Sequence, residues 1–173
     1  MESIAEKAYQ AFDMFKKGAL VAAGNEAHHN ACTIGWGSMG TIWRAKQVIT
    51  VYLHPARYTT NFLKDNDLFT VSFYPEECKQ ALQVMGSLSG RDGDKEKIAG
   101  LTPVGIDGTI TFEEAEVTFV CRKLYEGRFL KEGLHDDVKT MYAASPKTFP
   151  PDENGEWQPH DMFIGEVIDV LEK

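Results

Sequence analysis

Three short segments of the chain hold residue types that could bind a ligand together. The first, NACTIGWGSMGTIW (residues 30–43), has glycines at 35, 37 and 40 that let backbone amides approach a flat molecule, and Trp36 adds a large apolar surface. A barrel strand with a tight bend and two core tryptophans would explain the same residues. Taken by itself, this segment favours that second interpretation.

The second segment, HPARYTTNFLKD (residues 54–65), places Arg57 just before a predicted short helix that begins near Thr59. Free backbone amides, the helix dipole, two threonine hydroxyls and a guanidinium would converge there, which suits a phosphate dianion. Ordinary capping is the alternative, because any helix favours threonine at its start. Arg57 shifts the balance slightly toward an anion site.

The third segment, GSLSGRDGDK (residues 86–95), could surround an anion with hydroxyls, backbone amides and cations from Ser87, Ser89, Gly90, Arg91 and Lys95. A helix is predicted to begin near Asp92 or Asp94. As an isolated motif, the segment favours a turn and a capped helix, because carboxylates beside a phosphate cost free energy. It has neither the residue order of a P-loop nor that of a dinucleotide-binding GxGxxG turn.

The histidines and cysteines of the sequence form no recognised catalytic or metal motif. There is no HExxH, no GxSxG and no CxxC, and the cysteines are odd in number at three. We therefore expect no metal site and no disulfide framework. His160 lies where a long loop rejoins the predicted sheet, so it could assist proton transfer, with a capping or surface role as the alternative.

Charge and composition limit the classes of partner. The chain of 173 residues has 18 basic and 26 acidic residues, a net charge of -8, and 43% hydrophobic residues. We expect one soluble domain over residues 1–173 that binds neither nucleic acid nor a membrane surface. Residues 1–10 lack the apolar core of a signal peptide, and the unpaired cysteines fit a cytoplasmic location.

The pattern of apolar residues predicts a mainly β protein. Helical spacing of apolar residues over 2–17 indicates an amphipathic N-terminal helix that packs on the domain, with a partner-binding helix as the alternative. Strands are predicted over 19–25, 31–36, 47–53, 68–74, within 108–130 and over 162–172, and short helices over 59–65, 75–85 and 94–98. Because strands follow one another, an antiparallel barrel is favoured. Residues 143–161, with four prolines, are predicted to be an irregular surface segment.

Taken in order, residues 30–43, 48–77, 86–103 and 159–170 resemble the flavin reductase-like FMN-binding proteins, especially the flavoredoxin-like branch. The resemblance covers about residues 18–170. It implies an antiparallel Greek-key split barrel over residues 18–171, with the N-terminal helix at 1–17 and short peripheral helices. It also implies a homodimer that holds FMN non-covalently near the subunit interface.

The resemblance also implies residue roles. The strand and turn beside the flavin ring correspond to Thr33, Ile34, Gly35, Trp36 and Ser38. The segment at the phosphate corresponds to Arg57, Tyr58, Thr59 and Asn61, and the second phosphate loop to Ser87, Ser89, Gly90, Arg91 and Lys95. His160 corresponds to a histidine close to where a nicotinamide could dock.

The function implied is an FMN-binding oxidoreductase. It would take electrons from NADH, NADPH or a redox partner and pass them to a flavin, an iron complex or a small acceptor. An FMN-storage or electron-carrier protein with little turnover, and a scaffold protein without flavin, are the alternatives. The hairpin with His28 and His29 and the 144–160 loop depart from the family pattern, where substrate or partner choice would be set.

Overall fold

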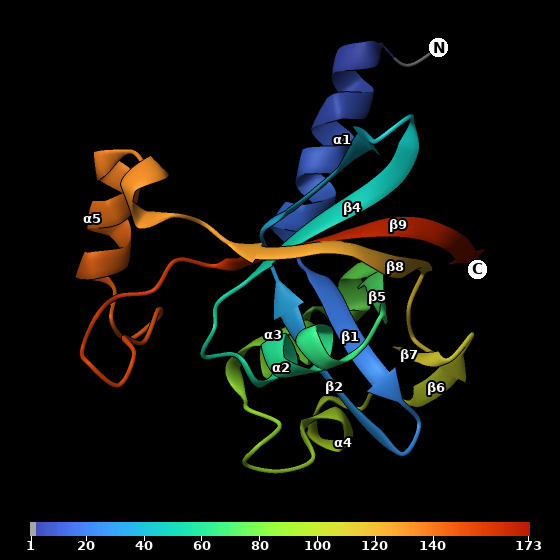
Figure 1. Ribbon diagram of the computed structural model, residues 1–173. Coiled ribbons are helices and arrows are strands. Elements are labelled where there is room, and N and C mark those ends of the chain that lie inside the picture. Colours follow the sequence, from blue (N-terminus) through green and yellow to red (C-terminus); the bar gives the residue numbers. More distant parts are fainter. Residues whose placement is uncertain (1–2) are drawn as a thin grey trace.

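The computed structural model describes residues 3–173, except for the side chain of Ala8. In this part of the chain, seven strands form one antiparallel sheet in the order β2-β1-β5-β8-β9-β4-β3, and β6 and β7 form a separate pair (Figure 1). The strands are β1 (Ala19–Asn25), β2 (His28–Ile34), β3 (Gly37–Ile42), β4 (Lys46–Leu53), β5 (Leu68–Phe73), β6 (Pro103–Ile106), β7 (Thr109–Phe112), β8 (Val117–Arg128) and β9 (Asp161–Glu172). The helices are α1 (Ile4–Lys17), α2 (Tyr58–Asp65), α3 (Lys79–Ser87), α4 (Lys95–Ala99) and α5 (Asp136–Ala144), with 3-10 turns at Glu76–Cys78 and Lys131–Gly133.

The two edge strands of the large sheet, β2 and β3, follow each other directly in the chain. For both to remain in one sheet, the sheet must curl until its edges come close together. The Tyr52 amide on β4 donates to the Trp36 carbonyl at 3.4 Å, which extends the pairing of β3 and β4 into the β2–β3 connection. The result is a curled sheet in which residues of β2 and β4 line a common cavity, described below.

The strand β1 is buried on both faces, which explains its continuous apolar sequence. Ala19, Val21 and Ala23 pack in the core inside the curled sheet with Phe69 and Phe163. The alternate residues Leu20 and Ala22 pack in a second core on the other face. Residues of α3, β7 and the segment after α4 complete that second core, namely Leu82, Met85, Ile110, Phe112 and Leu101. The cavity-bearing loops are thus attached to a rigid scaffold.

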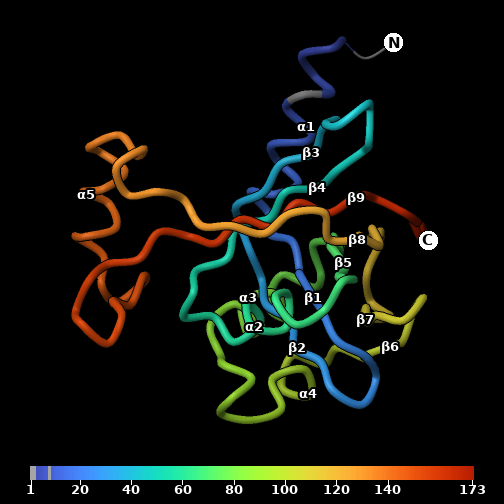
Figure 2. Tube along the Cα trace, viewed as in Figure 1, coloured from blue at the N-terminus to red at the C-terminus, as the bar shows by residue number. Residues whose placement is uncertain are grey.

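Two segments project from the sheet body. In Figure 1, α1 extends away at the top, and residues 129–160, which we call the arm, extend to the left with α5. The tube trace follows the same path out of β8 and back into β9 (Figure 2). Within residues 3–173, no helix has the length and apolar character needed to cross a membrane.

Most elements expected from the sequence are present. The predicted N-terminal helix is confirmed over Ile4–Lys17, whereas residues 1–2 lie outside the described residues. Its packing is only partly as expected, because Phe15 is buried but Ile4 is 88% and Phe12 70% exposed. For the first segment, the interpretation as a barrel strand with a tight bend placed Trp36 and Trp43 in the core. This expectation is wrong, since both side chains are exposed.

Three elements were not predicted. Residues 37–41 were expected to be a turn but belong to β3, because pairing with β4 overrides the low strand propensity of its glycines. β6 begins with a proline, which masks the strand pattern, whereas its partner β7 lies within residues 108–130, where strands were predicted. Helix α5 was missed because Tyr142 is its only fully buried side chain, so no apolar face shows in the sequence.

Candidate functional site

A small cavity of about 80 Å³ lies between the start of α2 and the loop that joins α3 to α4. Its walls are built mainly from the second and third segments singled out by sequence, and its lining residues are Cys32, Ala56, Arg57, Tyr58, Thr59, Ser87, Leu88, Ser89, Gly90 and Lys95. The structure therefore brings together two segments that are about thirty residues apart in the chain.

Lys95 is the only fully buried lysine among the described residues, with 4% of its surface exposed. Its Nζ donates to the carbonyl oxygens of Met85 at 3.3 Å and Leu88 at 3.4 Å. Burial lowers the pKa of this ammonium, and the Arg57 cation lowers it further. No carboxylate in residues 3–173 forms an ion pair with Lys95, so its charge favours an anion in the adjoining cavity.

Two arginines tie the 86–95 loop to the start of α2. The Arg57 Nη1 donates to the Gly86 carbonyl at 2.7 Å. Arg91 lies over the Tyr58 ring, 4.5 Å from its centroid, and its Nη1 donates to the Ala56 carbonyl at 3.3 Å. Both guanidiniums thus fix the cavity wall while adding positive charge beside it.

Gly90 packs closely against Asn30. A Cβ on Gly90 would clash with the Asn30 Nδ2, so a larger residue there would have to displace the Asn30 side chain. The Asn30 Oδ1 accepts a hydrogen bond from the Thr59 hydroxyl at 2.7 Å, and both side chains are buried. The Thr59 hydroxyl therefore stabilises the cavity wall by holding Asn30. The N-cap residue of α2 is Arg57, and its side chain makes no capping hydrogen bond.

The serines of the loop are partly engaged by the backbone. Ser87 donates to the Gln83 carbonyl at 2.8 Å, and the Ser89 Oγ accepts from the Arg91 amide at 3.2 Å. Asp94 caps α4 by accepting from the Lys97 amide at 3.0 Å, so the helix start predicted near Asp94 is confirmed. The carboxylate of Asp94 is thereby used by the helix.

A second cavity, of about 270 Å³, adjoins the first, and Arg57 and Cys32 line both. It contains the strand end predicted from the first segment, together with residues from β4 and the arm. The lining residues are Cys32, Thr33, Ile34, Gly35, Trp36, Tyr52, Leu53, His54, Arg57, Thr148, Phe149 and His160. The first cavity, with its cationic wall, and the second cavity, with its aromatic wall, therefore lie next to each other and share Arg57 and Cys32.

His160 lies at the aromatic end of the second cavity and is 7% exposed. Its ring centroid is 4.4 Å from that of Trp36 and 5.4 Å from those of His54 and Phe149. Burial is the main cause that lowers the pKa of His160 to about 3, with the neighbouring His54 and Arg57 acting in the same direction. His160 is thus a neutral imidazole near neutral pH, and it is neither a surface nor a capping residue.

A third, larger cavity of about 770 Å³ continues from the second past Gly35, Trp36 and Tyr52. Ser38, expected in the turn beside the flavin ring, lines this cavity and not the second one, together with Phe12 and Phe15 of α1. Tyr52 stacks on Phe129 with centroids 5.6 Å apart. The walls of this third cavity are mainly apolar.

The structure brings together nearly all the site residues proposed from sequence. Two of them, Asn61 and Arg91, are absent from the walls of the three cavities described above, and Asn61 is exposed on α2. Arg91 lies behind the wall against Tyr58. Sequence reasoning missed Cys32, Tyr52, His54 and Phe149 as wall residues. His54 is the first residue of the second segment and could have been included, whereas nothing in the arm sequence signals Phe149.

A model of the flavin reductase-like domain matches residues 14–173. The chain belongs to the flavin reductase-like family. Its mainly antiparallel β-structure, with an N-terminal helix and short peripheral helices, matches the split barrel of FMN-binding proteins, which confirms the predicted fold. No curated protein matched the chain in sequence.

Three solved structures illustrate the shared fold. Flavoredoxin from Methanosarcina acetivorans is 18% identical with a TM-score of 0.66, and the match covers 90% of this chain and 68% of that one. An FMN-binding protein from Thermus thermophilus with bound p-hydroxybenzaldehyde is 24% identical with a TM-score of 0.66, covering 90% and 71%. Flavoredoxin of Desulfovibrio vulgaris (Miyazaki F) is 19% identical with a TM-score of 0.64, covering 90% and 69%.

Proposed function

We propose that this member of the flavin reductase-like family binds FMN and uses it as an oxidoreductase. The observation that carries the proposal is the buried Lys95, whose hydrogen-bond partners within residues 3–173 are two backbone carbonyls and which lines a cavity that adjoins an aromatic one. One end suits a phosphate dianion and the other suits a flat ring. FMN has both groups, so the residues present fit this cofactor.

The residues of the site have distinct tasks in this proposal. Lys95 and Arg57 bind the phosphate, with Arg91 holding the wall behind them. The backbone at Thr33, Ile34 and Gly35 supplies hydrogen-bonding groups along the strand edge. Bound FMN supplies the redox chemistry itself, so the protein positions the partners and needs no metal or catalytic acid of its own.

The arm and the apolar surface around α1 are assigned roles in water exclusion, substrate binding and dimer formation. Phe149 and Trp36 limit water access to the aromatic end, which favours direct electron transfer between bound partners. The third cavity leaves room for NADH, NADPH or a small acceptor such as an aromatic carbonyl, a free flavin or an iron complex. The exposed apolar residues of α1 support a homodimer in which a second subunit completes this cavity.

The first test is an absorbance titration of the protein with FMN, for the wild type and Lys95→Met. Charge-assisted hydrogen bonds contribute about 1.5–3 kcal/mol, so Lys95→Met should weaken FMN binding by roughly 10- to 150-fold. The folded apoprotein should be no less stable, because the variant removes a buried cation. Lys97→Met, an exposed position on the same helix, is the matched control and should bind FMN as the wild type does.

A wild-type protein that takes up no FMN would contradict the proposal directly. Anaerobic stopped-flow mixing of the FMN-loaded protein with NADH or NADPH then tests the oxidoreductase part, since bleaching of the flavin band reports reduction. Flavin that both nicotinamides leave oxidised would indicate an electron carrier or storage protein instead.

A further inference from the structure

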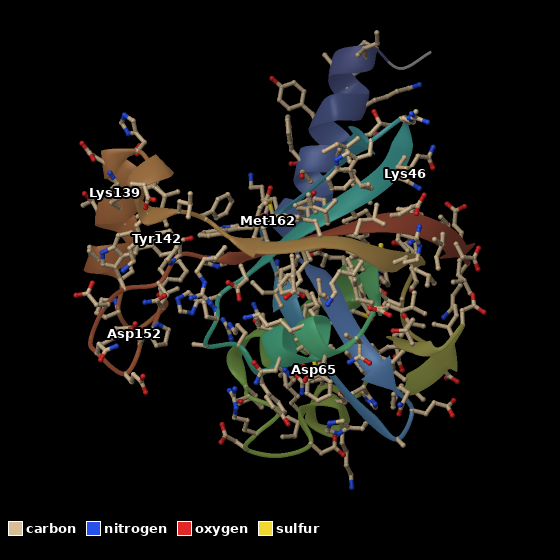
Figure 3. All side chains as sticks on the ribbon, viewed as in Figure 1. Lys46, Asp65, Lys139, Tyr142, Asp152 and Met162 are labelled. Atoms are coloured by element: carbon tan, nitrogen blue, oxygen red, sulfur yellow. The ribbon has the colours of Figure 1, made fainter. Side chains whose placement is uncertain are left out.

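Tyr142 and His160 form a buried hydrogen-bonded pair between α5 and the start of β9. The Tyr142 hydroxyl oxygen lies 2.7 Å from the His160 Nδ1 and accepts from the His160 backbone amide at 3.2 Å. Tyr142, labelled on α5 in Figure 3, is 3% exposed. One hydroxyl is therefore shared between the backbone and the ring of the same histidine.

The positions of the protons follow from this geometry. The backbone amide can only donate, so the Tyr142 oxygen is its acceptor. The hydroxyl proton then needs an acceptor of its own, and within residues 3–173 the His160 Nδ1 is the one within reach. A buried hydroxyl proton without an acceptor would be costly. The Nδ1 must therefore be unprotonated, and the neutral ring carries its proton on Nε2.

We propose that Tyr142 is a positioning residue that holds His160 in the Nε2–H tautomer, so that His160 offers the second cavity a hydrogen-bond donor and no base. This inference deepens the proposed function and rests on it for the identity of the ligand. The group bound by His160 would be an oxygen or unprotonated nitrogen of the flavin or of a molecule beside it. Proton transfer by this imidazole is not part of the mechanism.

Burial supports the same protonation states. It raises the pKa of Tyr142, which keeps the phenol a donor, and it lowers the pKa of His160. The charged and titratable groups around the His160 ring are His54 and Arg57 on the cavity side and Asp161 next in the chain, with Asp161 alone favouring the charged ring. The Asp161 carboxylate forms ion pairs with Arg128 at 2.6 Å and with Lys64 at 2.8 Å.

Other residues of the arm pack against Tyr142 and order the loop that leads to His160. The Trp157 ring stacks on that of Tyr142 with centroids 5.5 Å apart and an interplanar angle of 9°. The Lys131 Nζ lies 4.5 Å from the Trp157 ring centroid. Asp152, also labelled in Figure 3, accepts from the Gln158 side chain at 2.7 Å and orders the loop before β9. The arm thus acts through Tyr142 on a cavity residue.

The decisive experiment is nitrogen-15 NMR of the histidine rings, which distinguishes the tautomers without any ligand. In the wild type, His160 should show an unprotonated Nδ1 and a protonated Nε2 at pH 7, with unchanged shifts at pH 5.5. Tyr142→Phe should move the Nδ1 signal toward the protonated position, because the hydroxyl donor is gone. Tyr125→Phe, at an exposed tyrosine, is the control and should leave the His160 signals unchanged.

A protonated Nδ1 in the wild type would overturn the proposal even if Tyr142→Phe failed to fold. So would a folded Tyr142→Phe protein whose His160 kept its tautomer. In the FMN-loaded protein, Tyr142→Phe should raise KM for the nicotinamide by about 2- to 10-fold with kcat nearly unchanged, as expected for one lost neutral hydrogen bond. His160→Gln, which keeps a donor near the Nε2 position, should retain more binding than His160→Leu. If FMN does not bind at all, the proposed function fails while the NMR result still decides the tautomer.

Discussion

His160 and Lys95 are both buried in the walls of adjoining cavities, and burial lowers the pKa of each. The two differ in their partners. His160 has a hydroxyl donor at Nδ1 and is surrounded by aromatic rings, so its neutral form is favoured. Lys95 has two carbonyl acceptors, which favour its cationic form. The same desolvation therefore produces a neutral donor at one end of the site and a cation at the other.

The lowered pKa of His160 predicts a loss of stability in acid. Between about pH 6.5, the ordinary histidine pKa, and its folded pKa of about 3, the unfolded chain binds a proton at this ring and the folded chain does not. Stability should therefore fall as the pH falls below about 6.5. From pH 7.5 to pH 5 this single ring should cost about 2 kcal/mol.

Urea unfolding of His160→Gln at the two pH values checks this prediction. The variant has no imidazole at this position, so its stability should fall by about 2 kcal/mol less than that of the wild type. His135→Gln, at an exposed histidine on the arm, is the control and should follow the wild type. Equal acid losses for wild type and His160→Gln would show that the ring is protonated in the folded protein.

At the residue level, the sequence predicted the site where side-chain type alone indicates chemistry. Arg57, Lys95 and the glycine-flanked Trp36 were found because cations, glycines and an aromatic stood in short motifs. Cys32 and Tyr142 were not predicted as site residues, since each is an ordinary apolar or aromatic residue within a strand or helix. Their importance comes from distances across the fold, such as the 2.7 Å between the Tyr142 hydroxyl and His160.

At the element scale, His29 joins the β1–β2 hairpin to α4. Its Nδ1 lies 2.9 Å from the Asn25 carbonyl oxygen and its Nε2 lies 3.0 Å from the Glu96 carboxylate. Both contacts are to acceptors, so the geometry suits a doubly protonated ring. The Glu96 carboxylate is the main cause that raises the pKa of His29. The neighbours of this pair in sequence are Asn30, which accepts a hydrogen bond from the wall residue Thr59, and Lys95, which lines the first cavity itself.

The raised pKa of His29 predicts a stability contribution that is present at low pH and lost at high pH. It is complete below the ordinary histidine pKa and disappears as the pH rises through the raised, folded value. Glu96→Gln should therefore lower Tm by about 2–4 °C at pH 6 and by less at pH 8.5. Thermal unfolding followed by circular dichroism measures both differences, with the exposed Glu132→Gln as control. A Tm difference that grew with pH would contradict the assignment.

The elements that sequence reasoning missed share a physical cause. β3 has four exposed residues in succession after Ser38 and is a strand only because β4 lies beside it. α5 buries Tyr142 alone, against Trp157 and His160. Local patterns predict elements that pack on the main core, as for β1, and they do not predict elements fixed by one or two distant contacts.

At the scale of the whole molecule, the apolar face around α1 and the third cavity belongs with the proposed homodimer. Phe12 is 70%, Trp36 41% and Met39 37% exposed, and all three line the third cavity. Large exposed side chains so close together favour burial against another protein surface. Light scattering of the wild type should therefore give about twice the chain mass of 19.4 kDa.

A charge placed in this face should separate the subunits and affect the cofactor together. Phe12→Glu should shift the protein toward the monomer, because burying an unpaired carboxylate is costly. The third cavity shares Gly35, Trp36 and Tyr52 with the aromatic second cavity. If the second subunit completes the third cavity, FMN affinity should therefore fall in the same concentration range as the dimer dissociates. Ile98→Glu is the control, since Ile98 is 65% exposed on α4, at the opposite end of the molecule from α1 (Figure 1). A wild-type monomer that binds FMN with full affinity would mean that one chain makes the whole site, and the exposed face would then need a different partner.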